Sequence, residues 1–338
     1  MEPPADSFEV LLASALRRGI GRDLASVTRL SGGASQETYA VDAGADQQTE
    51  PLILRRRPGG ASESAGVAIG LETEAQLLEL AAQAGVPVPA VRHVLVPEDG
   101  LGSGYLMQRL AGETIPRRIL RDESFAAARP LLARQCGEIL ARIHAVPRDT
   151  LPALPEAPAS VQWRQYRDRY DGFDWPHPVF ELAFRWIEER LPAGASMEAG
   201  GQTLVHGDFR HGNLIVGPDG VRGVLDWELA HLGDPLEDLG WLCVNSWRFG
   251  NIDLPVGGFG LREELFAGYQ AAGGRRVDPE RVRFWEIFGS LKWGVMCMMM
   301  LDVFERGVDR SVERAAIGRR ASEAEIDLLA LLASEGAA

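Results

Sequence analysis

The densest group of reactive side chains lies in LVHGDFRHGNLIV, residues 204–216, where polar residues stand between two apolar runs. Asp208 and Asn213 are five positions apart, and Asp226 lies in GVLDWE, which begins ten residues past Asn213. Mg²⁺ prefers oxygen ligands, usually one or two carboxylates together with substrate phosphates. Asn213 and Asp226 are therefore candidate metal ligands, and Asp208 is a candidate to accept a proton from a substrate hydroxyl.

The spacing D-x-x-x-x-N followed by a further Asp is that of the protein-kinase catalytic loop. In combination, HGDFRHGN and LDWELAHLGDPLEDLGW resemble the aminoglycoside phosphotransferase / choline kinase family, most closely the branch fused to, or encoded near, acyl-CoA dehydrogenases. The resemblance extends over about residues 8–305. It implies a protein-kinase-like fold, ATP and Mg²⁺ as cofactors, and phosphoryl transfer to a hydroxyl group. Asp208 then resembles the family's catalytic base, and Asn213 and Asp226 resemble its Mg²⁺ ligands.

Candidate nucleotide-binding residues lie in the first third of the chain. The segment RLSGGASQETYAV, residues 29–41, is typical of a strand, a Gly-containing turn and a strand, and such a turn lets backbone N–H groups approach phosphates. The third strand normally carries a Lys that pairs with a helix Glu, but the only Lys in this chain is Lys292. Arg stands in the matching place, and it can bind phosphate and carboxylate bidentately. The resemblance also places the adenine against the backbone that connects two lobes. The residues expected to bind nucleotide are Gly32, Gly33, Ala34, Ser35, Arg55, Glu74, Met107, Gln108 and Arg109.

Other polar residues near these motifs have two open interpretations. His206 either packs and hydrogen-bonds backbone or takes part in the chemistry, and packing is the favoured reading. Arg210 and His211 either touch phosphate or substrate or are solvated, and Glu228 either approaches the metal or lies in an exposed turn. Asp234 is typical of a helix N-cap, Asp238 is expected to brace the catalytic loop, and Arg56 and Arg57 are expected to be an exposed strand end. Four aromatic residues either bind an acyl or pantetheine-like tail or pack between helices: Trp163, Tyr166, Tyr170 and Trp175.

The elements expected to position these residues form two lobes. Residues 25–110 are expected to fold as strand–strand–strand–helix–strand–strand, after a helix over 8–19. Helices are expected to dominate beyond residue 122, except for strands within 203–226. The prediction is an α+β fold with a five-stranded nucleotide-binding lobe, residues 1–110, and a larger helical lobe for catalysis and substrate binding, residues 111–338. Expected helices cover residues 123–146, 160–192, 235–247, 259–273, 278–306 and 311–334.

The composition excludes several classes of protein. With 46% hydrophobic residues, 25% charged residues and a net charge of −13, the chain is a globular protein without the basic footprint of a nucleic-acid binder. Three separated Cys argue against a disulfide scaffold or a zinc site. No signal peptide is expected, and WGVMCMMML, residues 293–301, is too short to span a membrane and is typical of core filler. A cytoplasmic location is expected, and the oligomeric state stays open.

Three functions compete. The first is an ATP- and Mg²⁺-dependent kinase whose partner is a small molecule with a hydroxyl group, either a hydroxy acid or hydroxyacyl-CoA, or an aminoglycoside or choline. The second is a non-catalytic nucleotide-binding module, which would be expected to lack Asp208, Asn213 or Asp226. The third takes H-x-D-x-x-H, residues 206–211, as a transition-metal hydrolase site, which would need further ligands at suitable spacing.

Overall fold

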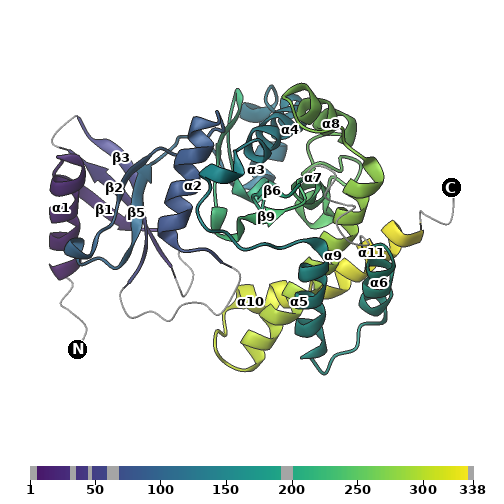
Figure 1. The fold of residues 1–338 in the computed structure, drawn as a ribbon. Coiled ribbons are helices and arrows are strands. Elements are labelled where there is room, and N and C mark those ends of the chain that lie inside the picture. Colours follow the sequence, from purple (N-terminus) through teal and green to yellow (C-terminus); the bar gives the residue numbers. More distant parts are fainter. Residues whose placement is uncertain (1–5, 31–35, 45–47, 59–67, 192–200, 334–338) are drawn as a thin grey trace.

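A computed structural model of the chain describes residues 6–30, 36–44, 48–58, 68–191 and 201–333. It has the predicted α+β architecture of a small lobe beside a larger helical lobe (Figure 1). The small lobe is built on an antiparallel sheet with the order β1-β2-β3-β5-β4, and helix α1 (Asp6–Ile20) covers its outer face. The strands are β1 (Leu24–Arg29), β2 (Glu37–Ala43), β3 (Glu50–Arg57), β4 (Val91–Val94) and β5 (Ser103–Gln108).

Alternation along β3 decides which residues face the large lobe. Leu52 and Leu54 are fully buried in a core that they share with Leu12 and Leu16 of α1. Because successive side chains of a strand point to opposite faces, Arg55 is directed to the other face, toward α2 (Leu71–Gln83). The strand pattern therefore places a cation at the boundary between the lobes.

Helix α2 connects the two lobes through a common core. Its buried positions, including Leu71, Ala75 and Leu78, belong to the same hydrophobic cluster as Leu140 and Trp227 of the large lobe. Figure 1 shows α2 between the sheet and the large lobe. The large-lobe core thus continues through α2 across the expected boundary at residue 110, while the sheet and α1 keep a core of their own, and this boundary stays a prediction.

The large lobe consists of helices and two short hairpin-like sheets. β6 (Thr203–Val205) pairs with β9 (His231–Gly233), and β7 (Leu214–Gly217) pairs with β8 (Gly220–Val224). The described helices are α3 (Pro116–Arg121), α4 (Arg129–His144), α5 (Ala159–Asp171), α6 (Pro178–Glu189), α7 (Leu236–Cys243), α8 (Arg262–Ala271), α9 (Pro279–Glu305), α10 (Val312–Gly318) and α11 (Ala321–Ala333).

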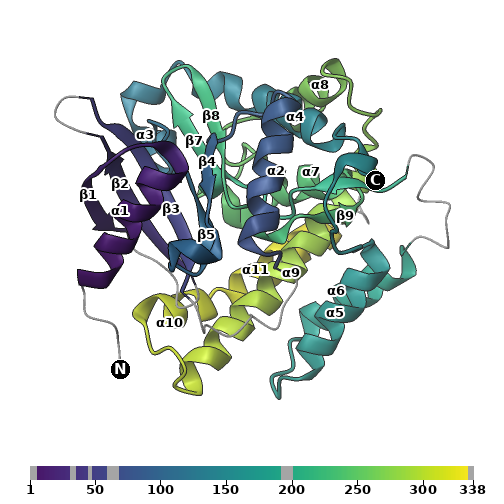
Figure 2. The same cartoon turned by 60° about the vertical axis from the view of Figure 1, so that its left-hand side comes forward.

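Several boundaries differ from those expected from the sequence. The expected helix over 160–192 is an antiparallel pair, α5 and α6, because Gly172 ends the first helix and Pro178 begins the second (Figure 2). The expected helix over 311–334 is likewise two helices, α10 and α11. The short elements α3 and β9 were not expected, since three to six residues carry little periodic signal.

Helix α9 agrees with the expected helix over 278–306, but its apolar part is longer than the segment 293–301. It spans 27 residues, and an 18-residue window within it has a mean hydropathy of 1.5, which satisfies the length and composition of a membrane span. More than half of that window is buried inside the protein, against α7, α11 and α6. In the described structure α9 is the central helix of the large-lobe core.

Candidate active site

Asp238 on α7 holds the loop that carries Asp208. Its carboxylate is fully buried and accepts hydrogen bonds from the backbone N–H groups of His206 (2.8 Å) and Gly207 (3.0 Å). Gly207 has a φ of 80°, and a Cβ at this position would collide with the carbonyl oxygen of Leu229, so only glycine fits. Asp238 therefore holds the backbone of the loop before Asp208, as expected from the sequence.

His206 serves the backbone of this loop. Its Nδ1 accepts from the N–H of Asp208 (3.2 Å), so its Nε2 carries the proton and donates to the carbonyl of Leu225 (3.1 Å). Burial lowers the pKa of His206, which keeps the ring neutral. The geometry matches the packing interpretation rather than a chemical role.

The carboxylate of Asp208 is held by three side chains. The indole N–H of Trp241 donates to Oδ1 (2.9 Å), and the amide of Asn213 donates to Oδ2 (2.7 Å). Nε of Arg210 lies between both oxygens, at 3.0 and 3.1 Å. Trp241 was not predicted from the sequence, because an apolar-rich helix such as α7 gives no sign of which indole reaches a carboxylate.

Asn213 and Asp226 lie next to each other at the ends of β7 and β8. The N–H of Leu225 donates to the backbone carbonyl of Asn213 (2.9 Å), which fixes the two strands in register. Asn213 also donates its side-chain Nδ2 to the carbonyl of Asp208 (2.9 Å), so its Oδ1 is the acceptor left over. Asp226 itself has a left-handed backbone conformation, with φ 68° and ψ 62°. For a non-glycine residue this conformation is uncommon and is often found at functional sites.

These two residues fit Mg²⁺ by the chemistry of their donors. One amide oxygen and one carboxylate are hard oxygen ligands, which suits a Mg²⁺ ion that completes its shell with phosphates and water. In the described part of the chain, no three His, Cys, Asp or Glu side chains are grouped to hold a metal ion. His206 and His211 both bond to backbone carbonyls, the latter to Gly257 (2.7 Å), which argues against the hydrolase hypothesis.

Arg55 connects the small lobe to the metal-ligand pair. Its guanidinium donates to Glu74 on α2 (2.9 Å), to Gln36 (2.9 Å) and to Asp226 (3.1 Å). Burial raises the pKa of Glu74 to about 6, although Arg55 acts to lower it. The structure thus brings Arg55 and Glu74 together as expected from the sequence, and it adds contacts of Arg55 with Asp226 and Gln36.

The neighbouring basic residues are not an exposed strand end. Arg56 is only 15% exposed and pairs with Glu37 at 2.7 Å. Arg57 is half-buried, and its Nε has no hydrogen-bond partner among the described residues. Glu228 is not an exposed turn residue either; burial raises its pKa, and Gln36 donates to it at 3.4 Å. The expectation of exposure failed for Arg56 because its guanidinium lies over the rings of Phe8 and Tyr39 within the small lobe.

The expected nucleotide contacts of the small lobe are only partly described. Gly32, Gly33, Ala34 and Ser35 lie outside the described residues. Met107 lies in β5, while the N–H groups of Gln108 and Arg109 donate to the carbonyls of Ala90 (2.8 Å) and Pro51 (3.0 Å). Those two N–H groups are therefore not free for adenine, and hydrogen bonds there would use carbonyl groups.

Comparison with known proteins decides the family. Residues 26–285 match the family model described as "Phosphotransferase enzyme family". The chain belongs to this phosphotransferase family. The predicted family and the prediction of an enzyme that phosphorylates an alcohol group are confirmed at this level.

Relatives and solved structures agree with this assignment. Acyl-CoA dehydrogenase family member 10 of Mus musculus is 33% identical over 226 residues, which are 63% of this chain and 20% of that protein. The chain thus spans about a fifth of that relative's length. A crystal structure from Ralstonia eutropha, described as an aminoglycoside phosphotransferase, has a TM-score of 0.73 at 19% identity, covering 95% of this chain and 97% of the other. Spectinomycin phosphotransferase APH(9)-Ia, in complex with ADP and spectinomycin, has a TM-score of 0.63 at 14% identity, covering 98% and 99%. These two structures confirm the fold.

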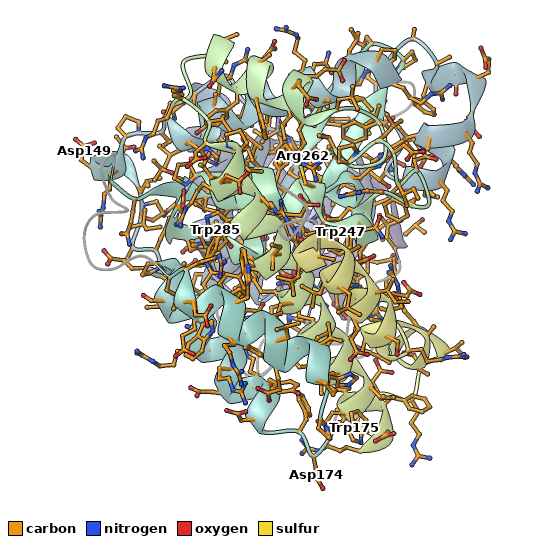
Figure 3. The ribbon with its side chains drawn as sticks, turned by 90° about the vertical axis from the view of Figure 1, so that its right-hand side faces the viewer. Asp149, Asp174, Trp175, Trp247, Arg262 and Trp285 are labelled. Carbon is orange, nitrogen blue, oxygen red and sulfur yellow. The ribbon has the colours of Figure 1, made fainter. Side chains whose placement is uncertain are left out.

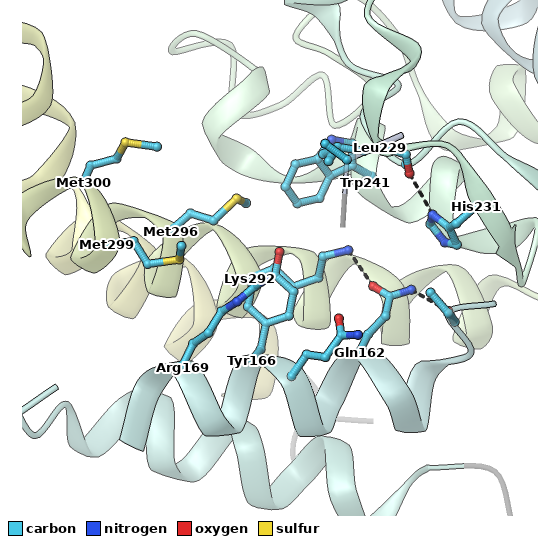
Figure 4. Close-up of a pocket in the computed structure, with 14 residues that line it drawn as sticks. Gln162, Tyr166, Arg169, Leu229, His231, Trp241, Lys292, Met296, Met299 and Met300 are labelled. Atoms are coloured by element: carbon cyan, nitrogen blue, oxygen red, sulfur yellow. Dashed lines mark hydrogen bonds between the residues drawn. The ribbon is translucent and has the colours of Figure 1, made fainter. Parts of the chain in front are cut away.

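The phosphotransferase has a pocket of about 240 Å³ beside Trp241 (Figure 4). Its apolar wall comes from Leu229, Tyr166 of α5 and three half-buried methionines of α9, Met296, Met299 and Met300. Of the four methionines in the segment expected as core filler, only Met298 is fully buried, and the other three line this pocket. Gly207 lies in the same wall, so the pocket opens next to the Asp208 loop.

The floor of the pocket contains a buried polar network around the only Lys of the chain. Nζ of Lys292 donates to Glu237 (2.9 Å) and to Gln162 (2.8 Å), and His231 lies 3.2 Å from the same carboxylate. Figure 4 shows Lys292 between Tyr166 and Gln162. Sequence reasoning missed this network, although a single Lys among 35 basic residues was a signal that this position requires a compact ammonium group.

The four aromatic residues expected either to bind an acyl tail or to pack between helices do not all have the same role. Tyr166 lines the pocket, whereas Trp163 donates to the carbonyl of Phe184 (3.0 Å) and packs edge-on against its ring. Tyr170 is buried between α5 and α6, and Trp175 lies beside Asp174 at the tip of this helix pair (Figure 3). Only one of the four aromatic residues therefore faces the pocket.

Proposed function

We propose that this phosphotransferase transfers the γ-phosphoryl group of ATP, in the presence of Mg²⁺, to a hydroxyl group of a small acceptor with an apolar portion. The observation that carries the proposal is the position of Asp208. Through Asn213 its carboxylate contacts the metal-ligand pair, and through Trp241 it contacts the apolar pocket. A base in this position can act on a hydroxyl at one side while the phosphates are held at the other.

The small lobe supplies the nucleotide contacts in this proposal. Arg55 binds the α- and β-phosphates while Glu74 balances its charge, and the backbone of Gly32, Gly33, Ala34 and Ser35 covers the phosphates. The backbone of Met107, Gln108 and Arg109 borders the adenine. Structural relatives support the nucleotide, since spectinomycin phosphotransferase contains ADP.

The reaction then follows from the positions of the side chains. Asn213 and Asp226 would hold Mg²⁺, which neutralises phosphate charge when bound. Asp208 orients the acceptor hydroxyl for in-line attack and accepts its proton. Trp241 and Asn213 hold the carboxylate in one orientation, so the base does not have to be ordered when the acceptor arrives.

The pocket lining favours an apolar or anionic acceptor over a polycation. Two of its lining residues are basic, Arg169 and Lys292, and among the described residues that line it none is Asp or Glu. An aminoglycoside or choline would bury positive charge against these groups without a facing carboxylate, which is unfavourable. A hydroxy acid or hydroxyacyl-CoA would place methylene groups against the methionines, and the names of the curated relatives agree with an acyl substrate.

A mass-spectrometric acceptor panel tests this function. The protein is incubated with ATP and Mg²⁺ together with hydroxy acids, hydroxyacyl-CoAs, aminoalcohols or aminoglycosides, and products are searched for the added phosphoryl group. We expect a phosphorylated product with a hydroxy acid or hydroxyacyl-CoA. The variant Met299→Arg should not form this product, because its charged side chain would occupy the pocket. Met298→Leu, on the buried face of α9, is the matched control. Phosphorylation of aminoglycosides alone would contradict the acceptor class, and no product with any hydroxyl compound would contradict the kinase.

The remaining expectations concern the environment of the enzyme. The absence of nucleic-acid partners stays a prediction from the acidic composition. A cytoplasmic location and the absence of membrane partners stay predictions from the expected lack of a signal peptide and of a membrane span. A non-catalytic module is disfavoured because Asp208, Asn213 and Asp226 are all present and lie together.

A further inference from the structure

The carboxylate of Asp208 already accepts from three donors. An ionised carboxylate offers about four lone-pair directions, two on each oxygen. Trp241 donates to Oδ1, Asn213 donates to Oδ2, and the single Nε–H of Arg210 is shared between both oxygens. An acceptor hydroxyl that donates its proton to Asp208 therefore competes with Arg210, which covers the side of the carboxylate between its two oxygens.

Arg210 is the donor that can leave most easily. Trp241 is nearly fully buried, and Asn213 is held by a second hydrogen bond to the backbone of Asp208. Arg210 is 27% exposed, and its hydrogen bonds to the described residues all come from Nε. Its two terminal nitrogens are therefore available for another anion.

The surroundings of Arg210 fit a side chain with two positions. The guanidinium lies over the ring of Trp247, 4.9 Å from its centroid, and a flat aromatic face holds a cation without fixing its direction. Gly212 leaves the space in which the guanidinium folds back, since a Cβ there would collide with its Nη1. The folded-back position is thus allowed by one glycine and stabilised by one carboxylate.

The terminal phosphate of ATP is the stronger partner for Arg210. For in-line transfer, that phosphate must lie next to an acceptor oxygen bound to Asp208, which brings it close to a guanidinium already in contact with Asp208. A phosphate carries more charge than a carboxylate and accepts bidentate hydrogen bonds from the terminal nitrogens of Arg.

We propose that Arg210 is a catalytic residue that blocks Asp208 in the nucleotide-free enzyme and moves to the terminal phosphate when ATP binds. This inference rests on the proposed kinase function and adds an order of binding to it. Asp208 becomes available to the acceptor only after the nucleotide is in place. The same movement supplies a positive charge to the transferred phosphoryl group.

NMR of Arg Nε–H groups tests the movement directly. In the full chain labelled with ¹⁵N-arginine, the Arg210 signal is assigned by its loss in Arg210→Lys. We expect Mg²⁺ with the non-hydrolysable imido analogue of ATP to shift this signal strongly, and Mg²⁺ with ADP to leave it nearly unchanged. The indole N–H signal of Trp241, labelled separately and assigned in Trp241→Phe, is the internal control and should move little. An Arg210 signal that stays in place with the analogue, or that moves equally with ADP, would overturn the proposal.

Nucleotide affinities provide a second test through a double-mutant cycle. Asp208→Asn weakens the competing partner of Arg210, so we expect about 2- to 10-fold tighter binding of the imido analogue and unchanged binding of ADP. In an Arg210→Met background the same substitution should have no effect, whereas simple repulsion between Asp208 and phosphate would persist there. A persistent gain, or no gain in the wild-type background, would overturn the movement of Arg210. Failure of both nucleotides to bind would instead contradict the proposed function.

Discussion

Arg55 balances carboxylates from both lobes, and its removal has two effects that can be separated. Without it, the protein loses the cation that we propose to bind phosphate, and Glu74 is left buried without a charged partner. Because burial already raises the pKa of Glu74 to about 6, this carboxyl can take up a proton instead of unfolding the protein.

We therefore predict that Arg55→Ala raises the KM for ATP at least roughly tenfold while the fold is kept, since a charge-assisted contact contributes about 1.5–3 kcal/mol. The double variant Arg55→Ala/Glu74→Gln should show the same KM and regain any lost thermal stability. Steady-state kinetics and circular dichroism measure the two effects. An unchanged KM would mean that Arg55 is only a connection between the lobes.

Asp226 is predicted to make nucleotide binding depend on Mg²⁺. In Asp226→Ala the only carboxylate of the proposed metal pair is lost, so calorimetry should find the same ATP affinity with Mg²⁺ as without it. Asp219→Ala, an exposed turn residue, is the matched control and should keep the difference. If Mg²⁺ strengthens ATP binding equally in Asp226→Ala and in the wild type, the metal assignment is wrong.

At the scale of elements, the network of Lys292 and Glu237 fixes α7 against α9 and α5. Burial alone would raise the pKa of Glu237, but Lys292 and His231 lower it to about 2. Burial alone would lower the pKa of Lys292, but Glu237 raises it. Since α7 also carries Trp241 and Asp238, this buried pair holds the helix that positions the Asp208 loop.

The lowered pKa of Glu237 predicts how stability changes with acid. The stabilisation is complete above the unfolded-state pKa of about 4.5 and is lost as the pH falls from there toward about 2, because the unfolded chain takes up the proton first. Glu237→Gln should flatten this part of the curve of unfolding free energy against pH. An equally steep curve in the variant would show that other groups cause the acid sensitivity.

Removing Lys292 instead of Glu237 should lower the free energy of unfolding at neutral pH. Lys292→Met leaves the buried Glu237 with only His231 and Gln162 as partners, and we predict a loss of up to about 3–5 kcal/mol in the free energy of unfolding, measured in urea. Replacing both partners, as in Lys292→Met/Glu237→Met, should recover much of this loss, because no charge is then left unpaired. Equal losses in the single and double variants would mean that Lys292 contributes by packing alone.

The sequence predicts elements well where apolar periodicity is long, and motifs well where chemistry restricts residue types. It placed β1 to β5, α2 and the residues Asp208, Asn213 and Asp226 correctly relative to one another. It failed for contacts between distant elements, such as Trp241 with Asp208 or Lys292 with Gln162, since neither local pattern nor composition records which buried faces meet. The pocket formed by α5, α7 and α9 was missed for the same reason.

At the scale of the whole molecule, the large-lobe core extends through α2 into the small lobe, and hydrogen bonds join the two lobes across the site. The backbone N–H of Ile69 donates to the carbonyl of Glu228 (2.9 Å), and that of Trp227 donates to the carboxylate of Glu74 (3.3 Å). We predict that urea unfolds both lobes in a single transition, with far-UV circular dichroism and tryptophan fluorescence giving coincident midpoints. All eight Trp lie in the large lobe, so an independently stable small lobe would separate the two curves.

The most direct test of the whole account is the turnover of Asp208→Asn with an acceptor found in the panel. The substitution keeps the size of the side chain but removes the carboxylate that we propose to orient the hydroxyl and take its proton. General-base catalysis contributes about 10²- to 10⁴-fold, so we predict a kcat at least roughly 10²-fold below the wild type, with ADP affinity nearly unchanged. Asp219→Asn, exposed and away from the site, should turn over normally. Wild-type turnover by Asp208→Asn would contradict the account, because the carboxylate would then serve only to satisfy the loop around it.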